Sequence, residues 1–236
     1  MLTLLGRDDP FPLVETALQE PNGLLCAGAD LSVARLLAAY RRGIFPWFSG
    51  GEPILWWSPD PRMVLFCDEL KVSRSLAKNF RNKGFEVRID SAFSGVIKAC
   101  AEPRKGEPGT WISKEMQAAY MALHRAGHAH SFETWHAGKL VGGLYGVAIG
   151  RAFFGESMFS RATDASKVAL VCLVDTLRER GMPMIDCQQR TPLLASLGAR
   201  EIPRRQFLRR LEALVNYGEP AEKWTRREPA PKHVPA

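Results

Sequence analysis

The chain has 236 residues, of which 46% are hydrophobic, and a formal net charge of +7. This length can bury a sizeable core in one or two domains. No apolar stretch is long enough to cross a membrane, and the N-terminus lacks the segments of a signal peptide. The five cysteines have no paired spacing, which argues against a disulfide framework. We therefore expect a soluble cytoplasmic protein.

The first sixty residues are rich in Pro, Gly and Trp and contain one clear helix. This helix should cover residues 33–42, with Ser32 as its N-cap. Four prolines and three tryptophans lie between Phe45 and Pro61, and we expect a rigid aromatic loop there, without regular structure. A domain boundary follows naturally after this loop. The predicted domains are residues 1–61 and residues 62–236.

The rest of the chain alternates helices and strands. The predicted strands cover residues 86–89, 129–135, 140–149, 152–158 and 184–188. The predicted helices between them cover residues 92–101, 113–126 and 165–180, the last of which is apolar nearly all round. The order is an antiparallel meander, a buried helix and a further strand. This order predicts an α+β fold, a mixed sheet with helices on its faces.

Two further helices carry basic residues. In the helix expected within residues 72–84, Arg74, Lys78 and Arg81 form one stripe and apolar residues form another. A basic stripe on an anchored helix suits contact with phosphate groups, and an ordinary solvated face is equally compatible with it. The helix expected over residues 204–215 has mixed charge, which favours a solvated face.

Two short apolar strands hold polar residues that a purely structural strand does not need. Because side chains alternate along a strand, Asp186 and Gln188 should share one face. By the same alternation, Glu156 should share a face with Phe154 and Met158. These faces border either an apolar pocket with a few polar groups or a solvated rim of the sheet.

The chain lacks the patterns of several common chemistries. Four histidines lie close together in sequence, but no cysteine or paired carboxylate completes a metal site. There is no G-x-S-x-G, phosphate loop or dinucleotide fingerprint. What remains is reaction by positioning, in which polar groups orient an activated substrate and an amine or alcohol nucleophile.

The order of elements is that of an acetyltransferase-like, or GNAT-type, fold. Such enzymes bind the CoA pyrophosphate on a glycine-rich turn before the buried helix. Here that turn would be residues 160–167, which contain no glycine. Side chains there would block the close approach of the pyrophosphate to the backbone. The architecture fits this class, but the cofactor does not.

Long strings of residues make a resemblance specific. Among them are YRRGIFPWFS (residues 40–49), ILWWSPDPR (54–62), LVGGLYGV (140–147), FGESMFS (154–160) and IDCQ (185–188). Between about residue 20 and residue 210, the chain resembles the leucyl/phenylalanyl-tRNA–protein transferase family. The resemblance implies a small N-terminal α/β domain and a C-terminal acetyltransferase-like domain that uses tRNA in place of CoA.

The resemblance also implies an activity. Such an enzyme moves Leu or Phe, sometimes Met, from aminoacyl-tRNA to the N-terminal Arg or Lys of acceptor proteins, and the product is marked for N-degron-dependent degradation. It needs no cofactor and no metal. Its reaction centre would contain Glu156, Asp186 and Gln188. We expect Asp186 to lie near the cationic N-terminus of the acceptor and Gln188 to hydrogen-bond the amine or the carbonyl.

Binding residues follow from the same hypothesis. The side chain of Leu or Phe needs an apolar pocket, although a plain core role is as compatible with any single candidate. The candidates are Leu144, Phe153, Phe154, Met158 and Ile185. Trp47 and Trp111 are expected to stack on the 3′ adenosine, and the acceptor stem should extend over Arg74, Lys78 and Arg81.

Two rival functions stay open. A CoA-dependent N-acetyltransferase is disfavoured by the glycine-free turn, and a non-catalytic tRNA-binding module does not explain Asp186 and Gln188.

Overall fold

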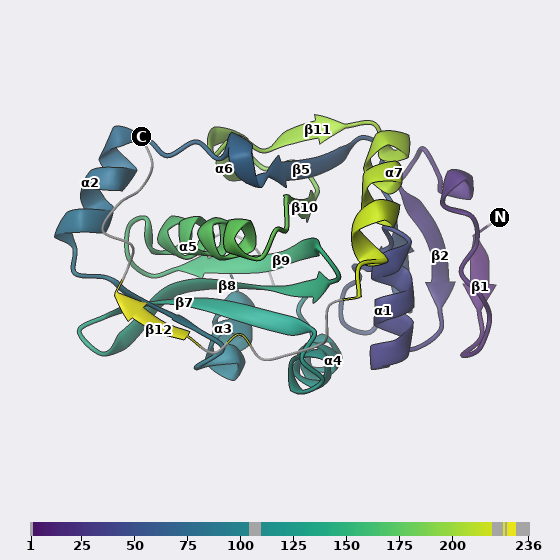
Figure 1. The fold of residues 1–236 in the computed structure, drawn as a ribbon. Helices are drawn as coiled ribbons and strands as arrows, with labels where there is room; N and C mark the ends of the chain where they lie inside the picture. Colours follow the sequence, from purple (N-terminus) through teal and green to yellow (C-terminus); the bar gives the residue numbers. More distant parts are fainter. Residues whose placement is uncertain (1, 104–109, 219–223, 225, 230–236) are drawn as a thin grey trace.

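The computed structural model describes residues 2–103, 110–218, 224 and 226–229, with only the backbone for Arg81 and residues 226–229. Its strands form two sheets (Figure 1). The smaller sheet has the order β1-β2-β4-β3 and belongs to the first part of the chain. Its strands are β1 (Thr3–Leu5), β2 (Leu24–Gly28), β3 (Phe45–Pro46) and β4 (Leu55–Trp57). The 3₁₀ turn η1 (Val14–Thr16) and helix α1 (Val33–Arg41) complete this part.

The segment expected to be an irregular aromatic loop contains strands β3 and β4, so that prediction was wrong. Proline is tolerated because β3 is the edge strand of the sheet, where a missing N–H breaks no ladder. Trp56 and Trp57 are buried, and their indole N–H groups donate to the carbonyl oxygens of Gly28 and Trp47. Burial of these rings therefore favours the strand over a loop.

The larger sheet has the order β11-β5-β10-β9-β8-β7-β6-β12. Strands β7, β8 and β9 form the expected antiparallel meander, and β10 runs parallel to β9 and antiparallel to β5. The mixed sheet and its helices confirm the predicted fold class. The strands are β5 (Arg62–Phe66), β6 (Glu86–Ile89), β7 (Ala129–His136), β8 (Lys139–Ile149), β9 (Ala152–Ser160), β10 (Met184–Gln188), β11 (Arg200–Ile202) and β12 (Arg226–Pro229).

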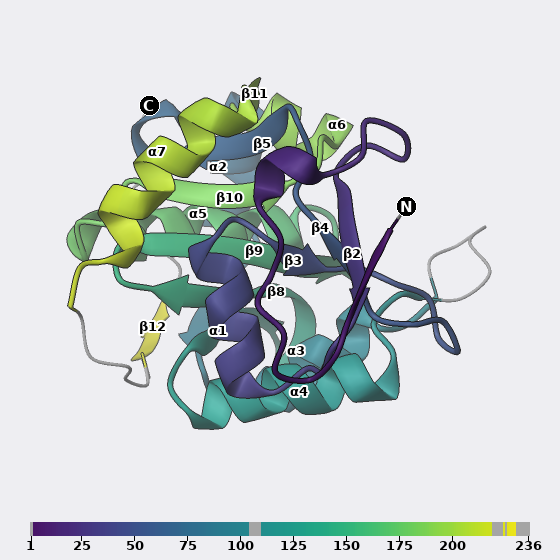
Figure 2. The same cartoon turned by 90° about the vertical axis from the view of Figure 1, so that its right-hand side faces the viewer.

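Helices cover both faces of this sheet. Helices α3 (Phe93–Cys100) and α4 (Lys114–Arg125) pack on one face together with the N-terminal part of the chain. Helices α2 (Arg74–Asn82) and α5 (Ala165–Glu179) pack on the other. Figures 1 and 2 show α1 and α7 (Arg204–Val215) next to each other at the end of the large sheet that is nearest to the N-terminal part of the chain. The remaining elements are the short helix α6 (Pro192–Ser196) and the 3₁₀ turn η2 (Cys67–Glu69).

Helix starts follow the sequence signals. The hydroxyls of Ser32, Ser73 and Ser113 each accept a hydrogen bond from the backbone N–H three residues later, at the starts of α1, α2 and α4. The apolar helix α5 is buried over most of its length, as its composition predicts.

Strands β9 and β10 pair only briefly, and this creates space for a site. Their ladder covers three residue pairs, from Met184 with Ala152 to Asp186 with Phe154. Beyond this point β9 continues to Ser160, while β10 ends at Gln188. The two strands therefore separate, and the sheet opens between them.

Candidate active site

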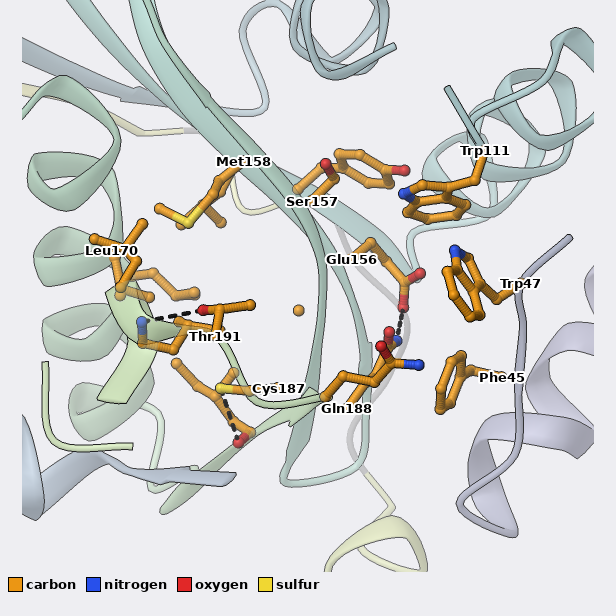
Figure 3. A pocket seen from close by; sticks show the side chains of 18 of the residues that line it. Phe45, Trp47, Trp111, Glu156, Ser157, Met158, Leu170, Cys187, Gln188 and Thr191 are labelled. Atoms are coloured by element: carbon orange, nitrogen blue, oxygen red, sulfur yellow. Dashed lines mark hydrogen bonds between the residues drawn. The ribbon is translucent and has the colours of Figure 1, made fainter. Parts of the chain in front are cut away.

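A cavity of about 460 Å³ lies where β9 and β10 separate (Figure 3). Its apolar side is formed by Leu144, Met158, Leu170, Leu173 and Ile185. Its aromatic side is formed by Phe45, Trp47 and Trp111, and Figure 3 shows the polar pair Glu156 and Gln188 facing these rings. The volume suits a small organic group, and the mixture of apolar walls with few polar groups is typical of binding sites. Of the two interpretations of these strands, the structure favours the pocket.

A β-bulge places Glu156 in the cavity. The register pairs Gly155 with Gly146 and Ser157 with Tyr145, so Glu156 is the extra residue of β9. Such a bulge redirects a side chain and shifts the alternation of the strand.

The alternation expected for β9 therefore needs a correction. Phe154 and Met158 pair with Val147 and Leu144, three positions apart on β8 and thus on opposite faces. The expectation that Glu156 shares a face with both residues was wrong, because it assumed an unbroken strand.

Three donors hold the Glu156 carboxylate. The Tyr40 hydroxyl of α1 donates to Oε1 (2.8 Å), the Tyr120 hydroxyl of α4 donates to Oε2 (2.6 Å), and Gln188 Nε2 donates to Oε1 (2.9 Å). Burial raises the pKa of the Glu156 carboxyl from 4.5 to about 7, and the hydrogen bonds from both tyrosines limit the rise. Burial also raises the pKa of both phenols well above 10, so they stay neutral donors. Glu156 is thus a fixed carboxyl that changes charge near neutral pH.

Asp186 has a different environment. Its two oxygens accept hydrogen bonds from Nε and Nη2 of Arg62 (2.8 and 2.7 Å), and both side chains are buried. Asp186 pairs with Val64 and Gln188 pairs with Met63, neighbouring residues on opposite faces of β5. The prediction that Asp186 and Gln188 share a face was wrong, because a second bulge lies between them. Asp186 does not line the cavity.

The other predicted residues divide into two groups. The cavity is lined by Leu144, Met158, Ile185, Trp47 and Trp111. The structure corrects the placement of two aromatic residues. Phe153 and Phe154 are fully buried, one in each core, and neither is among the lining residues, because both precede the point where β9 leaves β10.

The basic stripe lies on α2. Arg74 and Lys78 are exposed, while Leu76 and Phe80 bury the opposite side of the helix. The side chain of Arg81 lies outside the described part of the structure. Helix α2 is tied to the start of α5, since Asn79 Nδ2 donates to Asp164 Oδ2 (2.7 Å). The exposed cations therefore have a fixed position relative to the helix that borders the cavity.

Three important residues escaped the sequence analysis, namely Tyr40, Tyr120 and Arg62. Both tyrosines lie on apolar helix faces and have the pattern of ordinary core residues. Tyr40 and Arg62 each belong to a string that carries the family resemblance, and this was the one signal that could have marked them.

The start of α5 differs from a CoA-binding turn. Asp164 carries a negative charge at this helix N-terminus, with φ of +68°, and pairs with Lys167 (2.9 Å). A carboxylate at this position repels a pyrophosphate.

The described part of the chain contains neither a metal-binding cluster nor a membrane-spanning helix. Among residues 2–103, 110–218 and the few described beyond them, no group of three or more His, Cys, Asp and Glu residues is arranged to hold a metal ion. Within the same ranges no helix combines the length and apolarity needed to cross a bilayer.

The meander, the buried helix α5 and a parallel strand pair that separates around a cavity are the architecture of a GNAT-type acyltransferase. Residues 64–212 match the family model described as leucyl/phenylalanyl-tRNA protein transferase, and residues 29–60 match the model of its N-terminal domain. The chain belongs to the leucyl/phenylalanyl-tRNA–protein transferase family and is an aminoacyltransferase. This confirms the family predicted from the sequence.

Individual relatives agree with the family model. A leucyl/phenylalanyl-tRNA–protein transferase of Nitrosospira multiformis is 61% identical over 224 residues, which cover 95% of this chain and 97% of the relative. One of Thiobacillus denitrificans is 64% identical over 215 residues, 91% of this chain and 94% of the relative.

Among solved structures, FemX is similar with a TM-score of 0.46 and 12% identity, over 76% of this chain and 71% of that one. L-PGS from Bacillus licheniformis has a TM-score of 0.41 and 11% identity, over 68% and 52% of the two chains.

Proposed function

We propose that the chain transfers Leu or Phe from the 3′ end of aminoacyl-tRNA to the N-terminal Arg or Lys of acceptor proteins, and that transfer takes place in this cavity. The observation that carries the proposal is the buried Glu156 carboxyl group, which three hydrogen bonds fix between an apolar and an aromatic wall of the cavity. The family provides the donor and the kind of acceptor. The cavity provides a place for each part of the aminoacyl end.

The apolar wall suits the side chain of the transferred amino acid. Leu144, Met158 and Ile185 offer surface to leucine or phenylalanine without a polar partner. The aromatic wall suits the terminal adenosine, since bases stack on aromatic rings in many nucleic-acid sites. Trp47 is 39% exposed, so its ring is available for such stacking. The ester bond between the two parts would then lie beside Glu156 and Gln188.

The reaction is the attack of an α-amine on an ester that is already activated. The amine nitrogen bonds to the carbonyl carbon, the bond to the ribose oxygen of the tRNA breaks, and this oxygen leaves with a proton. Because an α-amine has a pKa of about 7.7–8.0, much of it is protonated at neutral pH and must first lose a proton. Ionised Glu156 accepts this proton, and Gln188 orients the reactants. The activated donor makes a cofactor or a metal unnecessary.

Charge gives a reason for the preference for cationic N-termini. The sequence suggested two anionic residues, Glu156 and Asp186, at the reaction centre. Arg62 balances Asp186 in the structure, so Glu156 is the carboxylate that faces the acceptor. The residue added to the acceptor would place it in the N-degron pathway, which also puts this activity in the cytoplasm with the aminoacyl-tRNA.

A transfer assay tests the proposal directly. The protein is incubated with leucyl-tRNA and a peptide that begins with Arg, and mass spectrometry should show a gain of one leucine. The same peptide with an acetylated N-terminus should gain nothing. Absence of transfer would refute the proposal. Binding of acetyl-CoA in calorimetry together with transfer of acetyl groups would replace it by the rival N-acetyltransferase.

A further inference from the structure

Arg62 is a buried cation with an unusually constrained environment. Its side chain is fully buried, and its guanidinium lies 4.7 Å from the ring centroid of Phe45 and 4.8 Å from that of Phe207. These rings come from β3 and α7, so Arg62 is held by the N-terminal part of the chain, by its own strand β5 and by α7. The two hydrogen bonds to Asp186 therefore start from a rigid group.

Asp186 transmits this constraint to the backbone of Gln188. Its Oδ1 accepts a hydrogen bond from the backbone N–H of Gln188 (2.9 Å) in addition to the one from Arg62. Gln188 has φ of +62°, a left-handed backbone conformation that residues other than glycine rarely adopt. The register between β10 and β5 shifts at this point. The hydrogen bond to Asp186 thus stabilises a strained turn.

The turn determines where the amide of Gln188 lies. Its Nε2 donates to Glu156 Oε1 (2.9 Å), which completes a chain of contacts from Arg62 through Asp186 and Gln188 to the carboxyl group in the cavity. A residue with ordinary φ at this position would follow the strand and point its side chain elsewhere.

We propose that Arg62 is a positioning residue for aminoacyl transfer: with Asp186 it fixes the left-handed turn at Gln188, so that the Gln188 amide holds Glu156 in its reactive position. This inference rests on the proposed function. It gives Asp186 a role that acts through Gln188, without contact to the substrate.

The ion pair suits this role better than a role in stability. A buried ion pair often contributes little net stability, because the loss of hydration offsets the attraction. The two parallel N–H···O bonds of an arginine do fix the plane of a carboxylate. Orientation of Asp186 is what the turn at Gln188 requires.

The test is a double-mutant cycle with Gln188→Ala. An apolar replacement of the pair, R62M/D186L, should lower kcat about tenfold and leave the KM for leucyl-tRNA within about twofold, with a similar Tm. In the Q188A background the same replacement should change kcat less than about twofold, because the amide that it positions is gone. Additive losses would overturn the proposal.

Further variants keep the test independent of folding. If R62M/D186L does not fold, Arg62→Lys takes its place in the cycle. This variant keeps the charge and loses one of the two parallel hydrogen bonds, so its effect on kcat should be smaller but also non-additive with that of Q188A. R62M/D186N restores an acceptor for the backbone N–H of Gln188, so its kcat should be at least about threefold higher than that of R62M/D186L. No recovery would contradict the proposed path. Arg200→Met breaks the exposed bidentate pair with Glu69 and should leave kcat unchanged.

A readout without turnover completes the experiment. The backbone amide of Gln188 should exchange slowly with deuterium in the wild type and much faster in R62M/D186L, while Met184 and Ile185 stay protected. Equal exchange in both proteins would overturn the positioning role. If the wild type transfers no leucine, the proposed function fails, whereas transfer with additive losses refutes only the inference about Arg62.

Discussion

Glu156 is a carboxyl group whose environment makes it a base near neutral pH. Burial alone would keep it protonated, and three donors lower its pKa again to about 7. We expect kcat/KM to rise with pH through about 7, as the proton-accepting form appears. Glu156→Gln should lower kcat about 100-fold and remove this part of the pH profile. The measurement is single-turnover transfer between pH 5.5 and 8.5, and a rise that persists in E156Q would assign it to another group.

The same carboxyl group makes stability depend on pH. Its pKa is raised in the folded state, so between about pH 4.5 and 7 the native protein binds a proton that the unfolded chain does not. Its contribution to the unfolding free energy therefore falls as pH rises through this window, on the order of 3 kcal/mol in all. Urea unfolding at several pH values measures this slope. E156Q should flatten it, and an unchanged slope would contradict the raised pKa.

Trp111 is expected to act on binding of the donor. A stacked base contributes about 1–3 kcal/mol, so Trp111→Ala should raise the KM for leucyl-tRNA about 5- to 150-fold with a smaller change in kcat. Trp111→Phe keeps a ring and should retain most of the affinity. The measurement is the dependence of initial rate on leucyl-tRNA concentration. A loss confined to kcat would place the adenosine elsewhere.

At the scale of elements, helix α2 presents a charged face at a defined position. Its buried side is fixed by Leu76 and Phe80, so Arg74 and Lys78 stay in solvent. Each phosphate contact contributes about 0.7–0.9 to the slope of log affinity against log salt. R74E/K78E should raise the KM for leucyl-tRNA and reduce this slope by roughly one to two.

Helix α7 offers a matched control. Arg205 and Arg209 are exposed on it beside Glu212, a face of mixed charge. R205E/R209E makes the same change in net charge as R74E/K78E. If the position of α2 matters, only the α2 variant changes the salt slope. Equal effects of both variants would show a response to overall charge alone.

At the scale of the whole molecule, the last described residues close the large sheet. Strand β12 pairs with β6, and the ring of Trp224 stacks on His130 with centroids 3.9 Å apart. The backbone N–H of Trp224 donates to Asp90 Oδ2 (3.0 Å), the oxygen that also contacts His130 Nδ1 (2.8 Å). The C-terminal segment thus covers a sheet edge that would otherwise be open.

This arrangement predicts a loss of stability on removal of one side chain. Trp224→Ala should lower the unfolding free energy by about 3–5 kcal/mol, the usual effect of removing a buried aromatic residue. Trp224→Phe should lower it less. Urea unfolding gives both values, and kcat measured well below the Tm should be close to that of the wild type. An unchanged midpoint would mean that the segment does not contribute to the fold.

Several elements could be predicted because their signals are local. Ser32 caps its helix as predicted, and strand β10 has the predicted bounds, since caps and apolar runs act within a few residues. Edge strand β3 and its partner β4 were missed, since pairing and ring burial depend on distant residues.

The site shows the same division. Glu156 and Gln188 could be selected as polar residues in apolar strands, and Trp47 and Trp111 as candidates for stacking on the terminal adenosine. The two bulges that aim Glu156 and Gln188 could not, because a bulge is a mismatch between strands and not a property of one of them.

The sequence by itself determined the fold class, the family and several of the residues around the cavity, because periodicity, helix caps and long motifs depend only on the order of the residues. Only the tertiary structure decided that Asp186 is bound by Arg62, and that Tyr40 and Tyr120 hold Glu156. These contacts join residues 124, 116 and 36 positions apart, and the charge of a buried carboxyl group depends on such neighbours.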